Sequence, residues 1–131
     1  MQLNHLNLQV SDAAQCADFL SQHFDLQTVL ERPDRTLIAM RAGDFDLVIQ
    51  QSDPAEAQAT SYPAGFHFGF IVAGEQALRQ AHARLLSAGV PGVGAITESR
   101  RGQQFFVDGP GGLTIELGWH LPKSAGSVAG A

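Results

Sequence analysis

Gly65-Phe66-His67-Phe68-Gly69-Phe70-Ile71-Val72 is the stretch that decides the fold of this chain. It predicts a strand with two unlike faces, because successive side chains of a strand point to opposite sides of a sheet. Phe66, Phe68 and Phe70 would share one face, and so much aromatic surface needs a helix or a second sheet to cover it. His67 falls on the other face, in the middle of the strand. We therefore expect His67 to point away from the main core, toward a polar or open space.

The chain around this stretch reads as two copies of one unit. In the first copy we expect a strand, a helix and three further strands, at residues 3–10, 11–24, 26–31, 36–41 and 45–51. In the second copy the same elements fall at residues 65–73, 75–88, 91–99, 103–107 and 113–119. Each copy is therefore β-α-β-β-β, and such a repeat predicts a fold built from two like modules.

The predicted fold class is α+β, with two tandem β-α-β-β-β modules. The predicted boundaries are 1–52 for the first module, 53–64 for a linker, 65–120 for the second module and 121–131 for a flexible tail. The linker is predicted because its residues are mostly small and polar, with a proline near each end. The tail is predicted because the residues after Leu121 are mostly glycine, alanine and serine.

Composition limits the classes of function. With 131 residues, 44% hydrophobic and 16% charged, the chain is expected to fold as one globular domain or as two small halves of one. A net charge of −5 argues against a nucleic-acid partner. No apolar run approaches the roughly 18 residues that a membrane span needs. Cys16 is the single cysteine, so no internal disulfide can form. Together with the lack of a secretory signal pattern at the start, this predicts a cytoplasmic protein.

Three polar residues hold corresponding places in their strands. His5 lies in the first strand of the first module, on the face opposite to the apolar residues of that strand. His67 has the same position in the first strand of the second module. Glu116 has the same relation to the apolar residues of the last strand. If the strands curl into a cup, all three side chains point into it. Two imidazoles and a carboxylate form a facial site for a divalent transition metal ion, and they leave positions open for water or substrate.

The alternative interpretation is that these three residues belong to an ordinary solvated face. A histidine or glutamate on a strand is most often structural or exposed. The remaining histidines are interpreted in this way, because His23 and His82 fall on predicted helices and His120 lies near the tail. The shared position of His5, His67 and Glu116 within their strands sets them apart.

Two segments resemble sequences of one known superfamily. His5-Leu-Asn-Leu-Gln-Val-Ser-Asp, with a helix after it, resembles the opening of vicinal oxygen chelate proteins. Phe105-Phe-Val-Asp-Gly-Pro-Gly-Gly-Leu-Thr-Ile-Glu-Leu is similar to their closing signature of an aromatic residue, Asp-Pro, Gly and a Glu before Leu. The superfamily includes glyoxalase I, fosfomycin-resistance enzymes, extradiol dioxygenases and bleomycin-binding proteins. The resemblance covers about residues 3–119.

The resemblance implies that the sheets of the two modules form a metal-binding β-cup. It implies metal ligands at His5, His67 and Glu116, with one divalent ion (Fe, Mn, Ni or Zn) in each cup. It also implies a homodimer in which each cup takes one module from each subunit. In that arrangement, His5 of one subunit joins His67 and Glu116 of the other.

Departures from the family's patterns distinguish among its activities. Glyoxalase I has a further glutamate ligand, its catalytic base, at the place held here by Val48, so its reaction is not expected. Extradiol dioxygenases usually carry a tyrosine in the stretch that reads Phe105-Phe106 here. Fosfomycin-resistance enzymes use basic residues, some beyond the last ligand, where this chain has only Lys123. Arg100 and Arg101 could bind an anion, but an exposed turn is the favoured interpretation of this pair. Bleomycin-binding members usually lack the ligands altogether.

We therefore expect a divalent-metal-dependent enzyme that acts on a small oxygenated substrate, with dioxygenase-like or lyase-, isomerase- or transferase-like chemistry. The alternative is a metal-free binding protein of the bleomycin-resistance type that sequesters a drug or metabolite. No catalytic residue is predicted beyond the metal ligands. The residues expected to face the substrate are Asn7, Gln9, Gln50, Gln104 and Trp119.

Overall fold

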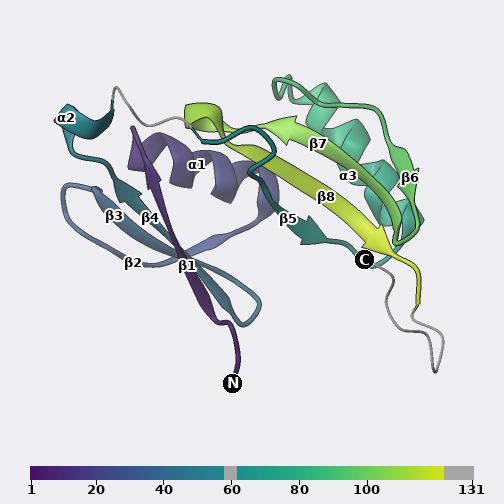
Figure 1. Ribbon diagram of the computed structural model, residues 1–131, viewed down its shortest axis with the longest axis horizontal. Helices are drawn as coiled ribbons and strands as arrows, with labels where there is room; N and C mark the ends of the chain where they lie inside the picture. The colour runs from purple at the N-terminus through teal and green to yellow at the C-terminus, as the bar shows by residue number, and fades with distance from the viewer. Residues whose placement is uncertain (58–61, 123–131) are drawn as a thin grey trace. The chain divides into compact units, whose positions relative to one another are not determined.

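A computed structural model describes residues 1–57 and 62–122 of the protein. The chain divides into two compact units (Figure 1). The first comprises residues 1–63 and 109–112, and the second comprises residues 64–108 and 113–131. Each unit contains one four-stranded sheet. The predicted α+β class, with a sheet and a helix in each of two repeated parts, is confirmed.

The first unit is a mixed sheet with one long helix packed on it. Its elements are β1 (His5–Val10), α1 (Ala13–Phe24), β2 (Gln27–Glu31), β3 (Leu37–Ala42), β4 (Phe45–Gln51), the short α2 (Pro54–Ala57) and the turn η1 (Pro110–Gly112). The strand order is β1-β4-β3-β2. The β1 and β4 strands are parallel, whereas the other two pairs are antiparallel. The intervening α1 and β2–β3 hairpin provide the long connection that a parallel pair requires.

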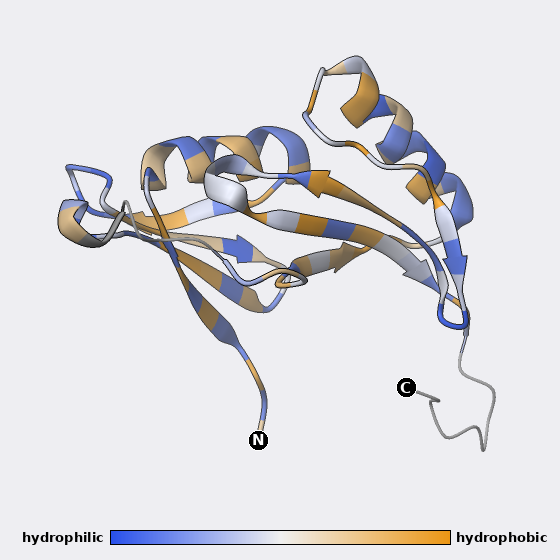
Figure 2. Cartoon of the chain, turned by 45° about the horizontal axis from the view of Figure 1, so that its top comes forward, coloured by the Kyte–Doolittle hydropathy of each residue, from blue (hydrophilic) through white to orange (hydrophobic). Residues whose placement is uncertain are grey.

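Alternation along β1 decides which face of the first sheet is buried. Leu8 and Val10 are buried, whereas His5, Asn7 and Gln9 are exposed. Figure 2 shows the same alternation of hydrophobic and hydrophilic residues along this strand. The buried side of α1 consists of Ala13, Cys16, Ala17 and Leu20. The predicted polar face of β1 is therefore the open face of the sheet.

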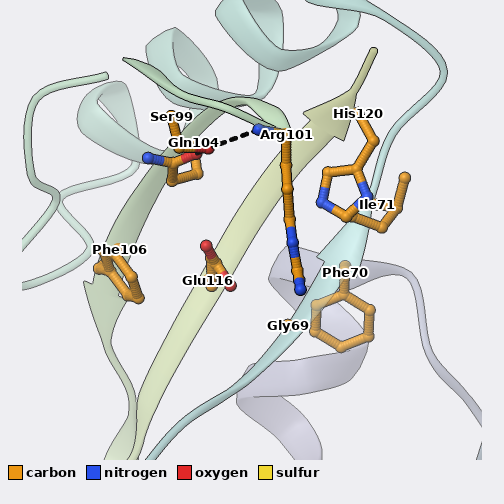
Figure 3. A pocket seen from close by; sticks show the side chains of 9 residues that line it. All are labelled: Gly69, Phe70, Ile71, Ser99, Arg101, Gln104, Phe106, Glu116 and His120. Carbon is orange, nitrogen blue, oxygen red and sulfur yellow. Dashed lines mark hydrogen bonds between the residues drawn. The ribbon is translucent and has the colours of Figure 1, made fainter. Parts of the chain in front are cut away.

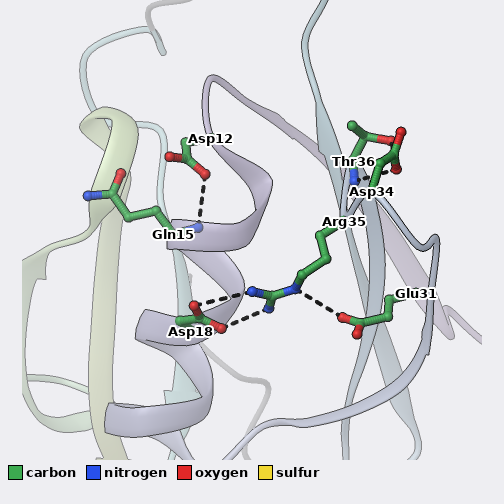
Figure 4. Close-up of polar contacts among 7 residues, drawn as sticks. All are labelled: Asp12, Gln15, Asp18, Glu31, Asp34, Arg35 and Thr36. Atoms are coloured by element: carbon green, nitrogen blue, oxygen red, sulfur yellow. Dashed lines mark hydrogen bonds and ion pairs between the residues drawn. The ribbon is translucent and has the colours of Figure 1, made fainter.

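Polar contacts fix the start of α1 and its outer surface (Figure 4). The Asp12 carboxylate accepts a hydrogen bond from the Gln15 backbone N–H at 3.0 Å, which is the contact of a helix cap. Arg35 donates to Asp18 at 2.8 Å and to Glu31 at 3.2 Å. The hydrogen bond from Arg35 lowers the pKa of Asp18. Because exposed ion pairs contribute little to stability, the buried side of α1 holds it to the sheet.

The second unit repeats this plan. Its elements are β5 (Phe68–Ile71), α3 (Glu75–Ser87), β6 (Thr97–Ser99), β7 (Gly102–Asp108) and β8 (Thr114–His120). The strand order is β5-β8-β7-β6, again with the opening and closing strands parallel and the others antiparallel. The core of this unit includes Leu78, Leu85, Phe105, Ile115 and Leu117.

His82 is partly buried against the core of the second unit. Its Nε2 lies 2.8 Å from the carbonyl oxygen of Gly94, and its ring meets that of Phe105 edge-on with centroids 4.8 Å apart. Because a carbonyl oxygen only accepts, Nε2 must donate this hydrogen bond. The structural interpretation of His82 agrees with these contacts.

The strand expected over residues 65–73 is shorter than predicted. Gly65 adopts a positive φ of 85° in a turn, and regular pairing begins at Phe68. His67 therefore lies just before β5 and not in its middle, which corrects the sequence prediction. Phe66 is 39% exposed, so the three phenylalanines do not form one buried face as expected.

The strand expected over residues 91–99 is also mostly absent. Regular pairing is limited to Thr97–Ser99. Gly92 has a φ of +66°, and a Cβ at this position would lie 2.1 Å from a carboxylate oxygen of Asp108. The chain therefore turns here against Asp108, and β6 begins only at Thr97.

Part of the predicted linker, residues 58–61, and most of the predicted tail, residues 123–131, lie outside the described residues. Within the described linker, residues 54–57 form α2. Among the helices of the described residues, none combines the length and apolar character needed to cross a membrane.

Cys16 provides a test of the packing of α1. The side chain is 1% exposed, and burial, with a smaller effect of Asp12, raises the pKa of its thiol to about 11. Since the thiolate is the reactive form, we expect iodoacetamide at pH 8 to modify Cys16 at least about 100-fold more slowly in the native protein than in guanidinium chloride. Mass spectrometry of timed samples measures both rates. Similar rates in the two conditions would contradict the packing described here.

Candidate metal centre

Glu116 projects from the open face of the second sheet. In β8 its neighbours Ile115 and Leu117 are buried on the opposite face, whereas the Glu116 side chain is 34% exposed. It pairs with Gly69 of β5 on one side and with Phe106 of β7 on the other. A Cβ at Gly69 would lie 2.8 Å from the Glu116 backbone oxygen and 3.0 Å from its Cβ. Glycine at this position therefore allows β5 to approach the backbone of β8 closely at Glu116.

His67 is oriented by the turn that precedes β5. Its Nδ1 lies 2.8 Å from the carbonyl oxygen of Gly65. Because that oxygen only accepts, Nδ1 carries the proton of this hydrogen bond, which leaves Nε2 as the free nitrogen of the neutral ring. The ring also meets Phe106 edge-on, with centroids 5.3 Å apart. A backbone hydrogen bond to the second nitrogen is the usual way in which a metal-binding histidine is held in place.

The free nitrogen of His67 faces the carboxylate of Glu116. Nε2 and Oε2 are 3.5 Å apart. Both atoms present lone pairs when the ring is neutral, so this arrangement calls for a positive charge between them, either a proton on the ring or a metal ion. Two ligand atoms each about 2.1 Å from one ion lie roughly 3.0–3.4 Å apart at tetrahedral or octahedral angles. The donor atoms and their spacing therefore fit a shared divalent ion.

His5 has the same orientation of its ring nitrogens in the first unit. Its Nδ1 lies 2.7 Å from the Asn4 side-chain oxygen, so Nε2 is again left free. Asp46 is paired with His5 in the sheet, but its carboxylate accepts hydrogen bonds from Arg41 at 2.8 and 3.1 Å. These bonds lower the pKa of Asp46, and they occupy its oxygens. His5 therefore has a free ring nitrogen at this end of β1, as the predicted ligand role requires.

The structure brings together two of the three predicted ligands. His67 and Glu116 belong to the second unit, and His5 belongs to the first. Across residues 1–57 and 62–122 of one chain, no group of three His, Cys, Asp or Glu side chains is placed to hold a metal ion. The three-residue site therefore remains a prediction, in which a second subunit supplies the third ligand.

Strand pairing shows how the two units differ at the ligand position. Two residues after His67, Gly69 pairs with Glu116 of the closing strand. Two residues after His5, Asn7 pairs in the same way with Val48. Val48 therefore occupies the place in the first unit that Glu116 occupies in the second, and valine can neither bind a metal nor accept a proton.

A pocket of about 310 Å³ opens over the second sheet beside Glu116 (Figure 3). Its lining consists of Gly69, Phe70, Ile71, Ser99, Arg101, Gln104, Phe106, Glu116 and His120. Phenylalanine and isoleucine side chains form the apolar part, and the polar part comes from β6, β7, β8 and the β6–β7 turn. This mixture of an apolar wall and a few polar groups is typical of small-molecule sites.

The predicted substrate-facing residues are divided among three places. Gln104 lines the pocket. Asn7, Gln9 and Gln50 lie on the open face of the first sheet, where the Asn7 amide donates to Gln50 at 3.1 Å. Trp119 lies outside the lining, on the side of β8 that carries Ile115 and Leu117, and its indole N–H donates to Gln103 at 2.9 Å.

Arg101 and His120 also line the pocket, although the sequence favoured an exposed turn for Arg101 over anion binding and predicted no site role for His120. The place of His120 could have been predicted from the sequence, because His120 and Glu116 are four residues apart in β8 and therefore lie on the same face of the sheet. Arg101 lies in the turn between β6 and β7, where strand alternation does not predict the direction of a side chain.

Comparison with known proteins identifies the family. A family model described as the Glyoxalase/Bleomycin resistance protein/Dioxygenase superfamily matches residues 2–117. The chain therefore belongs to this superfamily, and the resemblance drawn from its opening and closing segments is confirmed. The comparison with curated proteins finds no match.

Solved structures share the fold over nearly the whole chain. A possible glyoxalase from Bacillus cereus is 29% identical with a TM-score of 0.78, covering 90% of this chain and 98% of the other. Lactoylglutathione lyase from Agrobacterium tumefaciens is 16% identical with a TM-score of 0.72, covering 90% and 92%. A variant of the fosfomycin resistance protein FosX from Listeria monocytogenes, complexed with Mn(II) and 1S,2S-dihydroxypropylphosphonic acid, is 16% identical with a TM-score of 0.75, covering 92% of each chain.

Gly69→Ala tests the close approach of β5 to Glu116. Because the added Cβ would overlap the Glu116 backbone, we expect unfolding free energy to fall by about 1–3 kcal/mol, as for other overpacked sites. Urea denaturation measures this change. Gly74→Ala is the matched control, since its backbone is extended at φ −178° and a Cβ there meets nothing within 4 Å. Equal losses in the two variants would contradict the proposed packing.

Proposed function

We propose that the protein is a divalent-metal-dependent enzyme that acts on a small oxygenated substrate. The observation that carries this proposal is the pair formed by His67 Nε2 and Glu116 Oε2, which face each other at 3.5 Å. The Gly65 carbonyl fixes the proton on the other ring nitrogen, so the pair presents two donor atoms to a cation. The FosX variant with Mn(II) in its structure supports the use of a divalent ion in this fold.

The proposed centre lies in a homodimer, where His5 from one subunit joins His67 and Glu116 from the other. Support comes from the chemistry of His5, whose Nε2 is left free by the hydrogen bond of Nδ1 to Asn4. Two histidine nitrogens and one carboxylate suit Fe, Mn, Ni or Zn. When bound, such an ion would supply Lewis-acid chemistry to two neighbouring substrate oxygens.

The residues of the second sheet would orient the substrate and limit its contact with water. Phe70, Ile71 and Phe106 form the apolar wall of the pocket. The Gln104 side chain is held by hydrogen bonds, because its amide donates to Thr97 at 3.1 Å and its oxygen accepts from Ser99 at 3.0 Å. Gln104 therefore gives the polar part of the pocket a fixed shape.

Val48 argues against a reaction that needs a carboxylate base from the first module. It holds the position in β4 that corresponds to Glu116 in β8. The proposed enzyme therefore differs from glyoxalase I in its proton chemistry, and dioxygenase-like, lyase-like or transferase-like reactions that use only the metal ligands fit the site better.

The second candidate is a metal-free protein that sequesters a drug or metabolite. It is supported by the apolar wall of the pocket, because Phe70, Ile71 and Phe106 would contact a ligand without any ion. The two candidates differ in their response to chelators. Ligand capture that persists in EDTA would favour sequestration over the proposed enzyme.

Replacing a proposed ligand tests the metal site. We expect Glu116→Gln and His67→Ala to weaken Mn(II) binding by at least about 100-fold, since loss of a direct ligand exceeds the usual effect of an outer-shell change. Calorimetric titration of the metal-free protein measures the affinity. Glu98→Gln is the matched control, because Glu98 is exposed and its carboxylate accepts a hydrogen bond from Gln103 away from the pocket. Equal Mn(II) affinity in all variants would remove the proposed centre.

Acidification tests whether histidine nitrogens hold the ion. Protons compete with metal for imidazole, so occupancy should fall as the pH is lowered through roughly 6.5. Elemental analysis after dialysis at several pH values measures the bound Mn(II). Full retention at pH 4 would show that the ion is bound without histidine.

A further inference from the structure

The turn between β6 and β7 holds Arg101 in a defined position. Ser99 pairs with Gly102, so Arg100 and Arg101 form a two-residue hairpin turn. The Arg101 backbone N–H donates to the Ser99 hydroxyl at 3.2 Å, and the Arg101 carbonyl accepts from the Leu121 N–H at 2.6 Å. Gly102 has a φ of +150°, and a Cβ there would lie 2.0 Å from the Trp119 backbone oxygen. The turn is therefore fixed at its backbone, and a glycine is required to close it.

The Arg101 side chain extends from this turn along the pocket. Figure 3 shows its guanidinium end between Glu116 and Phe70. Within residues 1–57 and 62–122, no hydrogen bond or ion pair involves this guanidinium. Arg35, Arg41 and Arg79, in contrast, each pair with a carboxylate. Arg101 thus presents its N–H donors to whatever occupies the pocket.

The charge and size of the pocket define the group that Arg101 would bind. Among the described residues that line the pocket, Arg101 is the one arginine or lysine, and Glu116 is the one carboxylate. A planar guanidinium matches the two oxygens of a carboxylate, and a single positive charge suits a monoanion better than a dianion. The volume of about 310 Å³ is at the small end of ordinary ligand pockets.

We propose that the substrate is a small organic acid whose carboxylate pairs with Arg101 while two neighbouring oxygens face His67 and Glu116. This inference rests on the proposed function, because the metal centre is what would bind the neighbouring oxygens. Arg101 is then the residue that selects an anionic substrate over a neutral one.

Calorimetric titration of the Mn(II)-loaded protein with D-glycerate tests this assignment, since glycerate carries a carboxylate and two neighbouring hydroxyls. Arg101→Ala should weaken glycerate binding by at least about tenfold, the effect of losing charged hydrogen bonds. Arg100→Ala, the matched control, removes the same charge from the neighbouring residue, which lies outside the pocket lining, and should leave the affinity within about twofold. Mn(II) affinity should be the same in both variants.

Two further probes identify the group that is recognised. Glycerol has neighbouring hydroxyls without the charge, and it should bind more weakly than glycerate and equally to wild type and Arg101→Ala. 1S,2S-Dihydroxypropylphosphonic acid carries a doubly charged group, and tighter binding of this compound than of glycerate would overturn the carboxylate assignment. Equal glycerate affinity in wild type and Arg101→Ala, or no detectable glycerate binding to wild type, would overturn the inference.

Failure of the proposed function has a different signature. A wild-type protein that takes up no Mn(II) would remove the metal centre. Glycerate titrations of the metal-free wild type, Arg101→Ala and Arg100→Ala would then decide the role of Arg101 separately. A selective loss in Arg101→Ala would support the anion site, and equal binding in all three would overturn it.

Discussion

Parallel pairing between the first and last strands of each unit is the constraint on which the candidate site depends. In the second unit, β5 and β8 are parallel and in register with Gly69 opposite Glu116. This register places Glu116 opposite the residue that lies two positions after His67. The missing side chain of Gly69 allows the two strands to approach closely at this point. A shift by one residue would turn Glu116 into the core, where an unpaired carboxylate is strongly unfavourable.

Alternation of buried and exposed residues explains which parts of the structure the sequence could predict. Alternation in β1 and β8 identified the open faces correctly, because one face of each strand is buried and period two follows directly. The start of the strand near His67 was predicted wrongly. The alternating phenylalanines indicate a strand from Gly65 onward, but Gly65 lies in a turn. The sequence contains fourteen glycines, and residue type alone does not indicate that Gly65 is one of those with a positive φ.

The position of Arg101 could not be derived from the sequence for a related reason. Its direction depends on the two-residue turn between Ser99 and Gly102 and on the close approach of Gly102 to the Trp119 backbone. Both are long-range features of the folded sheet. His120, by comparison, shares the parity of Glu116, and its place in the pocket follows from the strand alone.

The two units share one arrangement of strands but differ in the polar contacts on their open faces. On the open face of the first sheet, polar groups satisfy one another, as in the Asn7–Gln50 and Arg41–Asp46 contacts. On the second, Glu116 contacts only the ring of His67 among its ionisable neighbours in the described residues, and Arg101 has no ionic partner there. A cation bound by Glu116 would remove the charge that repels an anion from this pocket, and Arg101 would attract that anion. In the proposed site, these charges would favour binding of the metal before the acid, and the affinity for the acid would depend on the bound metal.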